Sequence, residues 1–178
     1  MPKPRLLLHV CCAPCSTHVI EKLKEDYELG CFFYGPNIHP EEEYVRRLKE
    51  SGGYCADQGI EFLEGKYDKE DWLQAVKGHE NDVEGGDRCT ICYRYRLQRT
   101  AEAAKNEGYD LFTSTLTVSP HKDADIINEI GKEIGRSTDV IFLSENFKKK
   151  HGYQISVQMS RDHGLYRQDY CGCVFSQR

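Results

Sequence analysis

The sequence predicts an α/β fold built on a Rossmann-like parallel sheet. Short apolar segments alternate with longer segments of helical pattern along the chain, and this order is typical of parallel strands joined by crossover helices. The chain has 178 residues, close to the usual length of one domain. No proline- or serine-rich linker and no internal repeat divides it. We therefore expect a single α/β domain over residues 1–178.

Five segments have the composition of short, buried strands. Residues 5–10 and 29–34 are almost continuously apolar, as expected for strands that helices cover on both faces. The remaining expected strands are 60–63, 109–116 and 139–143.

Helices are expected between these strands. His39 and Pro40 open a helix with three glutamates in its first turn, where negative charge suits the helix dipole. A glycine-rich loop over 78–87 precedes the longest helix, and Gly108 is placed to end it. The other expected helices are 16–23 (after a turn at 11–14), 68–77, 89–107, 123–134 and 153–163.

Composition and charge exclude several classes of protein. The net charge of −5 disfavours a protein that coats nucleic acid through bulk charge. The apolar run 6–10 is too short for a membrane span or a signal peptide, so we expect a cytoplasmic protein. The phosphate-binding patterns GxGxxG and GxxxxGK[ST] do not occur in the sequence. The absence of these patterns disfavours enzymes that transfer hydride from a dinucleotide and enzymes that adenylate a substrate with ATP.

Cysteine content is the most unusual feature of the sequence. There are nine cysteines, and in a reducing compartment structural disulfides are rare. The odd number also argues against a complete disulfide framework. Seven of them form three clusters: Cys11-Cys12-Ala-Pro-Cys15, Cys89-Thr-Ile-Cys92 and Cys171-Gly-Cys173. Metal binding or redox chemistry is the expected reason for so many thiols.

The spacing within two clusters places the thiols on one side of the backbone. Cys89 and Cys92 stand three apart at the start of a helix, where the helix terminus favours the thiolate that binds metal. Cys171 and Cys173 stand two apart, so in an extended segment they face the same way. Aromatic residues flank this last pair, which indicates that a cysteine-bearing C-terminal segment docks against the domain.

The remaining cysteines differ in their expected roles. Neighbouring side chains diverge, so of Cys11 and Cys12 we expect one to bind the main metal group and the other to face a substrate or a second metal. Cys31 and Cys55 lie outside the clusters, and we expect both to be inert, with Cys31 a small apolar residue inside a strand. Structural zinc sites commonly use paired CxxC motifs. One CxxC with a surplus of thiols favours a four-cysteine iron–sulfur cluster instead.

Basic and aromatic residues gather near the cysteines and toward the end of the chain. Phosphate neutralisation by basic groups and base stacking on aromatic rings are typical of single-stranded or looped RNA sites. A solvated, charged helix face is the alternative. The residues are Arg88, Tyr93, Arg94, Tyr95, Arg96 and Arg99 around the CxxC motif, then Lys148, Lys149, Lys150, His151, Arg161, Arg167 and Arg178.

Two loops that follow expected strands carry further candidates. Asn37 and Tyr44 follow the second strand and can reach a bound nucleoside. Residues 119–123 follow the fourth strand; Ser119 and Pro120 are expected as the cap and first residue of a helix, and the same loop is expected to line the site.

Five motifs together resemble one known family. They are LLLHVCCAPCS (6–16), NIHPxxEY (37–44), RCTICYxYRL (88–97), TSTLTVSPHK (113–122) and YCGCVFS (170–176). In this combination the sequence closely resembles the cobalamin-independent epoxyqueuosine reductases of the QueH type, over essentially the whole chain. The resemblance implies an adenine-nucleotide-hydrolase-like fold and an iron–sulfur enzyme. It also implies reduction of the epoxide of epoxyqueuosine to queuosine at the tRNA wobble position, the last step of queuosine synthesis.

The resemblance leads to a hypothesis for the individual residues. We assign Cys12, Cys89, Cys92 and Cys171 to a [4Fe-4S] cluster, with Cys15 as an alternative ligand. Cys11 and Cys173 would face the epoxide, as catalytic thiolates or as ligands of a separate mononuclear iron that acts as a Lewis acid. The expected substrate contacts are Asn37, Tyr44 and Arg94. The partners are then the tRNA anticodon loop and an unidentified electron donor.

Three other functions stay open at this point. A zinc- or disulfide-stabilised RNA-binding module needs the thiols but no catalysis. A small electron carrier needs no basic surface beside the CxxC motif. A thiol–disulfide oxidoreductase that uses Cys89 and Cys92 does not need five further clustered thiols.

Overall fold

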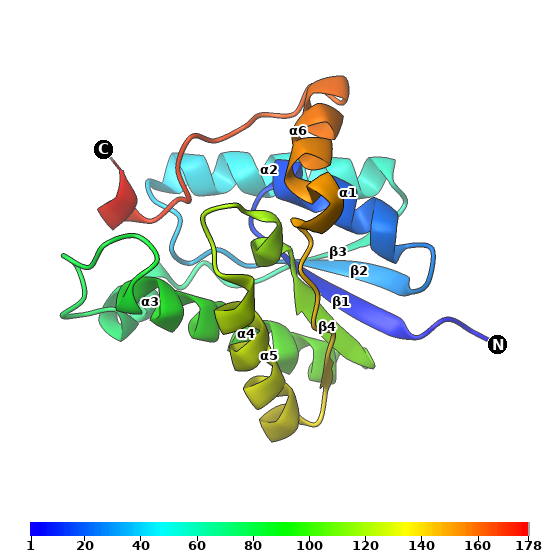
Figure 1. Ribbon diagram of the computed structural model, residues 1–178, viewed down its shortest axis with the longest axis horizontal. Helices are drawn as coiled ribbons and strands as arrows, with labels where there is room; N and C mark the ends of the chain where they lie inside the picture. The colour runs from blue at the N-terminus through cyan, green and yellow to red at the C-terminus, as the bar shows by residue number, and fades with distance from the viewer. Residues whose placement is uncertain (178) are drawn as a thin grey trace.

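A twisted parallel sheet forms the centre of the molecule (Figure 1). The computed structural model describes residues 1–177, so Arg178 lies outside the described residues. All neighbouring strands are parallel, in the order β3-β2-β1-β4-β5, and the predicted α/β class is confirmed. The strands are β1 (Arg5–Val10), β2 (Glu28–Phe33), β3 (Glu61–Glu64), β4 (Leu111–Ser114) and β5 (Ile141–Phe142).

Helices cover both faces of this sheet. Figure 1 shows α1, α2 and α6 on one side and α4 and α5 on the other. The helices are α1 (Ala13–Leu23), α2 (Glu41–Asp57), α3 (Lys69–Ala75), α4 (Asp87–Asn106), α5 (Ala124–Thr138) and α6 (Gly152–Asp162), with short 3-10 helices η1 (Thr115–Val118), η2 (Lys149–His151) and η3 (Val174–Ser176). Within residues 1–177, none of the helices is both long and apolar enough to cross a membrane.

The core is divided between the two faces of β1. Leu6 and Leu8 pack toward α1, with Val19 and Ile20, whereas Leu7 packs toward the helices of the other face. All three leucines are fully buried, and burial of each side chain contributes about 1.5–3 kcal/mol. The continuous apolar run of β1 is therefore explained by burial on both sides.

The order of the strands in the sheet creates a topological switch point beside β1. From β1 the chain moves to β2 and β3 on one side, and later to β4 and β5 on the other. In open parallel sheets, ligands bind at this switch point, beyond the carboxyl ends of the strands. Cys11 follows the last residue of β1, and η1 follows β4. The fold therefore brings the first cysteine cluster to the expected ligand-binding edge.

Several element boundaries differ from those predicted, for local reasons. The turn expected at 11–14 is wrong at Ala13 and Pro14, which begin α1, because proline fits the first turn of a helix. Cys15 therefore lies inside this helix. The strand predicted over 109–116 ends at Ser114, whose side chain accepts a hydrogen bond from the Leu116 amide and starts η1.

Other differences are smaller. β5 holds only residues 141 and 142 of the predicted 139–143, since Asp139 has a left-handed φ of 59°. β3 is shifted by one residue from the predicted 60–63. Asp123, not Ser119, caps α5 by accepting hydrogen bonds from the amides of residues 125 and 126. Gly108, with a φ of +71°, follows the end of α4 as predicted.

The C-terminal segment docks beside α2, as the flanking aromatic residues predicted. The His39 amide donates to the Gly172 carbonyl at 2.8 Å, and the backbones of Ile38 and Cys173 form an antiparallel β-bridge. Arg47 donates to the carbonyls of Tyr170 and Cys171 at 3.0 and 2.9 Å. Gly172 has a φ of +107° that few other residues adopt. That the chain forms a single domain stays a prediction.

A matched pair of glycines tests the packing that positions α6. A Cβ at Gly152 would collide with the backbone carbonyl of Phe147, whereas one at Gly53, on the exposed side of α2, would meet no atom within 4 Å. We expect Gly152→Ala to lower the free energy of unfolding by about 1–3 kcal/mol. Gly53→Ala should raise it by about 1 kcal/mol, as alanine favours helix. Urea unfolding measures both; equal midpoints for the two variants would contradict this packing.

Candidate functional site

A large cavity opens at the carboxyl edge of the sheet. Its volume is about 840 Å³, and its walls come from the start of α1, the loop after β4, one face of α6 and the C-terminal segment. Four sulfur-bearing residues from two ends of the sequence line it: Cys11, Cys12, Cys15 and Cys171. The loop predicted to line the site does so through residues 119–122.

A smaller pocket adjoins this cavity and holds the other cysteines. Cys89 and Cys92 from α4 line it together with Cys171 and Cys173. Cys171 and Arg96 border both spaces. The structure thus brings all seven clustered cysteines to one region, divided into two groups that meet at Cys171.

Nitrogen donors hold the sulfurs of the CxxC motif. The indole nitrogen of Trp72 donates to the sulfur of Cys92 at 3.3 Å, and the Gly85 amide donates to the sulfur of Cys89 at 3.2 Å. N–H donors of this kind stabilise a thiolate or a metal-bound sulfur. Burial raises the pKa of Cys92, and the opposing influences are Arg96 and the Trp72 hydrogen bond.

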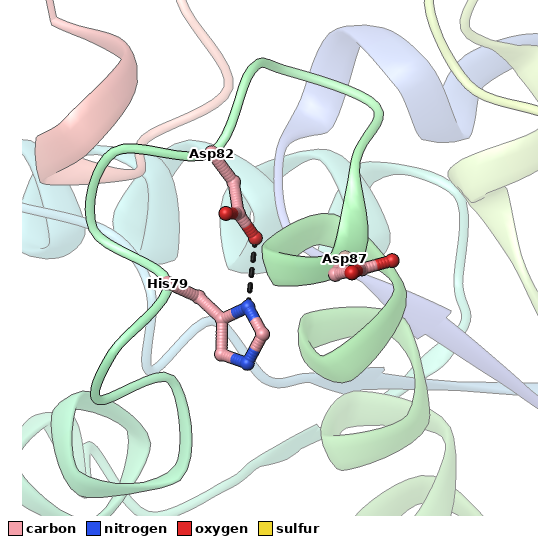
Figure 2. Close-up of side chains that lie close together, drawn as sticks. All are labelled: His79, Asp82 and Asp87. Carbon is pink, nitrogen blue, oxygen red and sulfur yellow. Dashed lines mark hydrogen bonds and ion pairs between the residues drawn. The ribbon is translucent and has the colours of Figure 1, made fainter.

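The loop before α4 fixes the position of this motif. Figure 2 shows His79 and Asp82 on the loop, joined by a hydrogen bond of 2.8 Å, with Asp87 on the first turn of α4. Polar atoms of these three side chains lie within 4.8 Å of one another. Asp82 also accepts a hydrogen bond from the Arg88 amide at 2.9 Å. These contacts attach the loop to the first turn of α4, directly before Cys89, and this structural role explains why the three side chains lie close together.

The arginines of α4 do not form the single basic surface that the sequence suggested. Arg88 is 2% exposed and donates to carbonyls of the preceding loop. Arg96 is also buried, at 3% exposed. Arg94 and Arg99 are exposed and pair with Glu133 and Glu102. Only part of this cluster can therefore meet RNA.

The C-terminal cysteines influence each other's protonation. The neighbouring Cys173 thiol lowers the pKa of Cys171 well below its ordinary value, and the Cys171 sulfur raises the pKa of Cys173. The Cys173 amide also approaches the sulfur of Cys171 at 3.4 Å, and Ser176 lies 3.1 Å from the same sulfur.

The first cluster brings its three thiols close together. The thiols of Cys11, Cys12 and Cys15 lie close enough to influence one another's pKa, and all three line the large cavity. The neighbouring Cys12 thiol and burial raise the pKa of Cys11 well above its ordinary value.

His9 is a buried residue that sequence analysis did not single out. Its Nε2 donates to the Tyr34 carbonyl at 2.7 Å, and its Nδ1 accepts from the Ser114 hydroxyl at 2.9 Å. Burial, with the Arg96 charge second, lowers the pKa of His9 to about 3, so the ring is neutral. The network ties together the ends of β1, β2 and β4 beside the cysteines. A histidine inside an apolar strand, directly before Val10 and Cys11, was the available signal.

The expected substrate contacts lie in different places. Asn37 is 1% exposed and lines the small pocket, where its Oδ1 has no hydrogen-bond partner among residues 1–177. Tyr44 is 4% exposed and stacks on Tyr67 with ring centres 3.8 Å apart. In the described part of the chain, neither Tyr44 nor Arg94 lines the two cavities.

The two cysteines outside the clusters also lie outside this site. Cys31 and Cys55 belong to the same hydrophobic core cluster, and each influences the pKa of the other.

Comparison with known proteins gives a consistent result. A family model described as "Epoxyqueuosine reductase QueH" matches residues 6–178. The chain is 40% identical to the epoxyqueuosine reductase QueH of Streptococcus pyogenes over 182 residues, covering 99% of this chain and 71% of the relative. It is also 40% identical to that of Thermotoga maritima, covering 96% of this chain and 89% of the relative.

Solved structures support the fold. The U34-tRNA thiolase NcsA from Methanococcus maripaludis, with its [4Fe-4S] cluster, matches at a TM-score of 0.64 and 13% identity, covering 100% of this chain and 63% of that chain. A predicted subunit of a tRNA methyltransferase from Methanocaldococcus jannaschii matches at 0.59 and 10% identity, covering 94% of each. Together they confirm the adenine-nucleotide-hydrolase-like fold. From its sequence relatives, the chain belongs to the epoxyqueuosine reductase QueH family.

Proposed function

We propose that this chain reduces the epoxide of epoxyqueuosine, at the wobble position of tRNA, to the cyclopentene of queuosine, and that it does so in the cytoplasm with a [4Fe-4S] cluster. One observation carries the proposal beyond family membership: seven thiols from three distant segments line two adjoining cavities, the larger of about 840 Å³, at the ligand-binding edge of the sheet. A reducing compartment keeps such thiols available.

The reaction sets requirements that the site can meet. Two C–O bonds of the epoxide break, a C=C bond forms and the oxygen leaves as water, so the reaction consumes two electrons and two protons. An external one-electron reductant must supply the electrons, and a bound iron–sulfur cluster would pass them on one at a time. Cys11 lines the large cavity, so its thiol is placed to transfer a proton to the departing oxygen.

The donor set fits an iron–sulfur cluster. Four thiol-bearing side chains border the small pocket, and N–H donors already point at two of their sulfurs. We propose Cys89, Cys92 and Cys171 as three ligands. Cys12 is the fourth in the assignment from sequence, and Cys173 is the fourth in the small pocket.

We also propose a separate mononuclear iron, in addition to the cluster, held by Cys11 and Cys173. These two cysteines border different cavities, on either side of Cys171. The alternative role for Cys11 is the direct proton transfer described above. Iron in excess of four per chain, in protein with a complete cluster, would support the separate iron.

The large cavity also carries groups suited to a nucleotide. Tyr153 and Tyr170 can stack on a base, and Lys122 and Arg167 can neutralise phosphate. Asn37 offers its unpartnered amide oxygen in the small pocket. NcsA and the methyltransferase subunit are named for tRNA substrates, and a tRNA anticodon loop is the partner we propose.

A basic segment stands next to this cavity. Lys149, Lys150 and His151 are exposed, and they directly precede α6, which lines the cavity. Lys150 and His151 have left-handed φ values of 54° and 63°, conformations that cost free energy in residues other than glycine. The Lys148 ammonium group donates to the Lys122 carbonyl at 2.7 Å and joins the segment to the cavity wall. We propose that this segment binds phosphates of the anticodon stem-loop.

The direct test is turnover. Anaerobically purified protein, given a chemical reductant and RNA that carries epoxyqueuosine, should form queuosine, which nucleoside mass spectrometry detects. Iron and acid-labile sulfide of about four each per chain should accompany activity. Stoichiometric zinc without sulfide, with cluster loss excluded, would instead favour a zinc-stabilised RNA-binding module.

Replacement of a central ligand should abolish cluster binding. We expect Cys89→Ser to lose the visible absorption and the labile sulfide, because a serine hydroxyl is a poor ligand for iron. Cys55→Ala is the matched control, since Cys55 lies in the core away from the site. A full spectrum in Cys89→Ser would contradict the assignment.

The fourth ligand can be identified by a second pair of variants. If Cys12 binds the cluster, Cys12→Ser should lose iron as Cys89→Ser does, while Cys173→Ser keeps its iron and loses turnover. The reverse pattern would assign the fourth position to Cys173. Iron and sulfide analysis on protein prepared in parallel measures this difference.

Charge reversal tests the basic segment. The double variant Lys149→Glu/Lys150→Glu should bind tRNA more weakly, and the slope of log K against log salt should fall by about one for each phosphate that the protein no longer neutralises. Lys132→Glu is the control, because Lys132 lies on α5 across the sheet and pairs with Glu129. An unchanged slope in the double variant would place the RNA elsewhere.

A further inference from the structure

Three buried arginines surround the cysteines, and two of them have evident partners. Arg47 forms an ion pair with Glu43 at 2.8 Å and donates to two carbonyls of the C-terminal segment. Arg88 donates to three carbonyls of the loop before α4. Their positive charges are therefore satisfied by the protein itself.

Arg96 differs from both. It is 3% exposed, and its Nε, like that of Arg88, is buried without a hydrogen-bond partner among residues 1–177. Unlike Arg88, whose Nη1 donates to three carbonyls, the Arg96 side chain has no hydrogen bond to any of residues 1–177. In the same part of the chain, no carboxylate lies within 4.0 Å of its guanidinium. Removal of a guanidinium from water is costly unless an opposite charge or acceptors replace the water. A buried, unpaired Arg96 indicates that its counter-charge is a group other than a carboxylate.

The surroundings of Arg96 show which group that is. It stands four residues after Cys92 on α4, so both side chains lie on the same face of the helix. It lines both cavities. The sulfurs that interact electrostatically with its charge are those of Cys92, Cys11 and Cys171. These three come from three different segments of the chain, and each lines a cavity that Arg96 also lines.

We propose that Arg96 is the built-in counter-charge of the iron–sulfur centre, with its unpartnered N–H groups available to the sulfurs of the bound centre, and that it thereby raises the reduction potential. The inference rests on the proposed function and names a residue that sets the reduction potential which that function needs. Reduction adds a negative charge to the centre, and a fixed positive charge favours that state. Hydrogen bonds to sulfur and net charge are recognised determinants of cluster potentials.

The chemistry of arginine suits this role better than that of lysine. A guanidinium keeps its charge when buried, and its planar fork can direct several donors at sulfurs in different directions. A lysine ammonium at this position would lose its charge more readily on burial. Charge alone can therefore be separated from donor geometry by substitution.

A redox titration of the purified, cluster-bound protein tests the proposal. In Arg96→Gln we expect the ratio of reduced to oxidised cluster at a fixed potential to fall about tenfold, which corresponds to about 59 mV for a one-electron couple. Arg99→Gln is the matched control: it removes the same charge from α4 at an exposed position paired with Glu102, and its potential should equal that of the wild type.

Further outcomes separate this inference from the proposed function. An intact cluster with an unchanged potential in Arg96→Gln would overturn the role of Arg96 alone. If Arg96→Gln loses its iron, Arg96→Lys decides: recovered iron with an intermediate potential supports the counter-charge, and folded protein without iron overturns it. Wild-type protein that contains no sulfide would overturn the proposed function, and with it the inference.

Discussion

The attachment of the C-terminal segment by Arg47 is the interaction on which the site depends. One buried guanidinium holds Glu43 of its own helix and the carbonyls of Tyr170 and Cys171. Loss of one partner of such a buried pair typically costs about 3–5 kcal/mol, since the other charge is left uncompensated. Together with the hydrogen bond from the His39 amide to the Gly172 carbonyl and the β-bridge between Ile38 and Cys173, this attachment holds Cys171 and Cys173 at the sheet edge, where Cys171 is the shared member of the two groups of cysteines.

The ends of the strands supply the rigid side of the same site. His9 joins the Tyr34 carbonyl to the Ser114 hydroxyl, and that hydroxyl accepts a hydrogen bond from the Leu116 amide. Because the ring is buried and neutral, the network joins the strand ends without placing a second positive charge beside the cysteines. Cys11 therefore starts from a fixed strand end, while Cys171 arrives on a docked segment.

Much of the fold could be predicted from the sequence because its signals are local. The apolar run of β1, the three glutamates that open α2 and the spacing of Cys89 and Cys92 each reflect the period of one element. Boundaries failed where one side chain decided them, as with Pro14 in α1 and Ser114 at the end of β4.

The sequence could predict which cysteines belong to the candidate site, but not how they divide between its two cavities. That seven cysteines converge followed from their number and clustering. Their division into two groups did not, because it depends on how the C-terminal segment packs against α2 and α4. The same is true of Arg88 and Arg96: in sequence both resemble surface arginines, and only tertiary packing buries them.

The wide separation of the cysteines along the chain has a thermodynamic consequence. A group bound by thiols from the start, the middle and the C-terminal region of the sequence acts as a reversible cross-link that closes very long loops. Such a link restricts the unfolded chain more than the folded one, and metal binding free energy then adds to folding free energy. If the cluster is bound as proposed, its assembly is linked to global stability, and oxidative damage to the site would lower the stability of the whole protein.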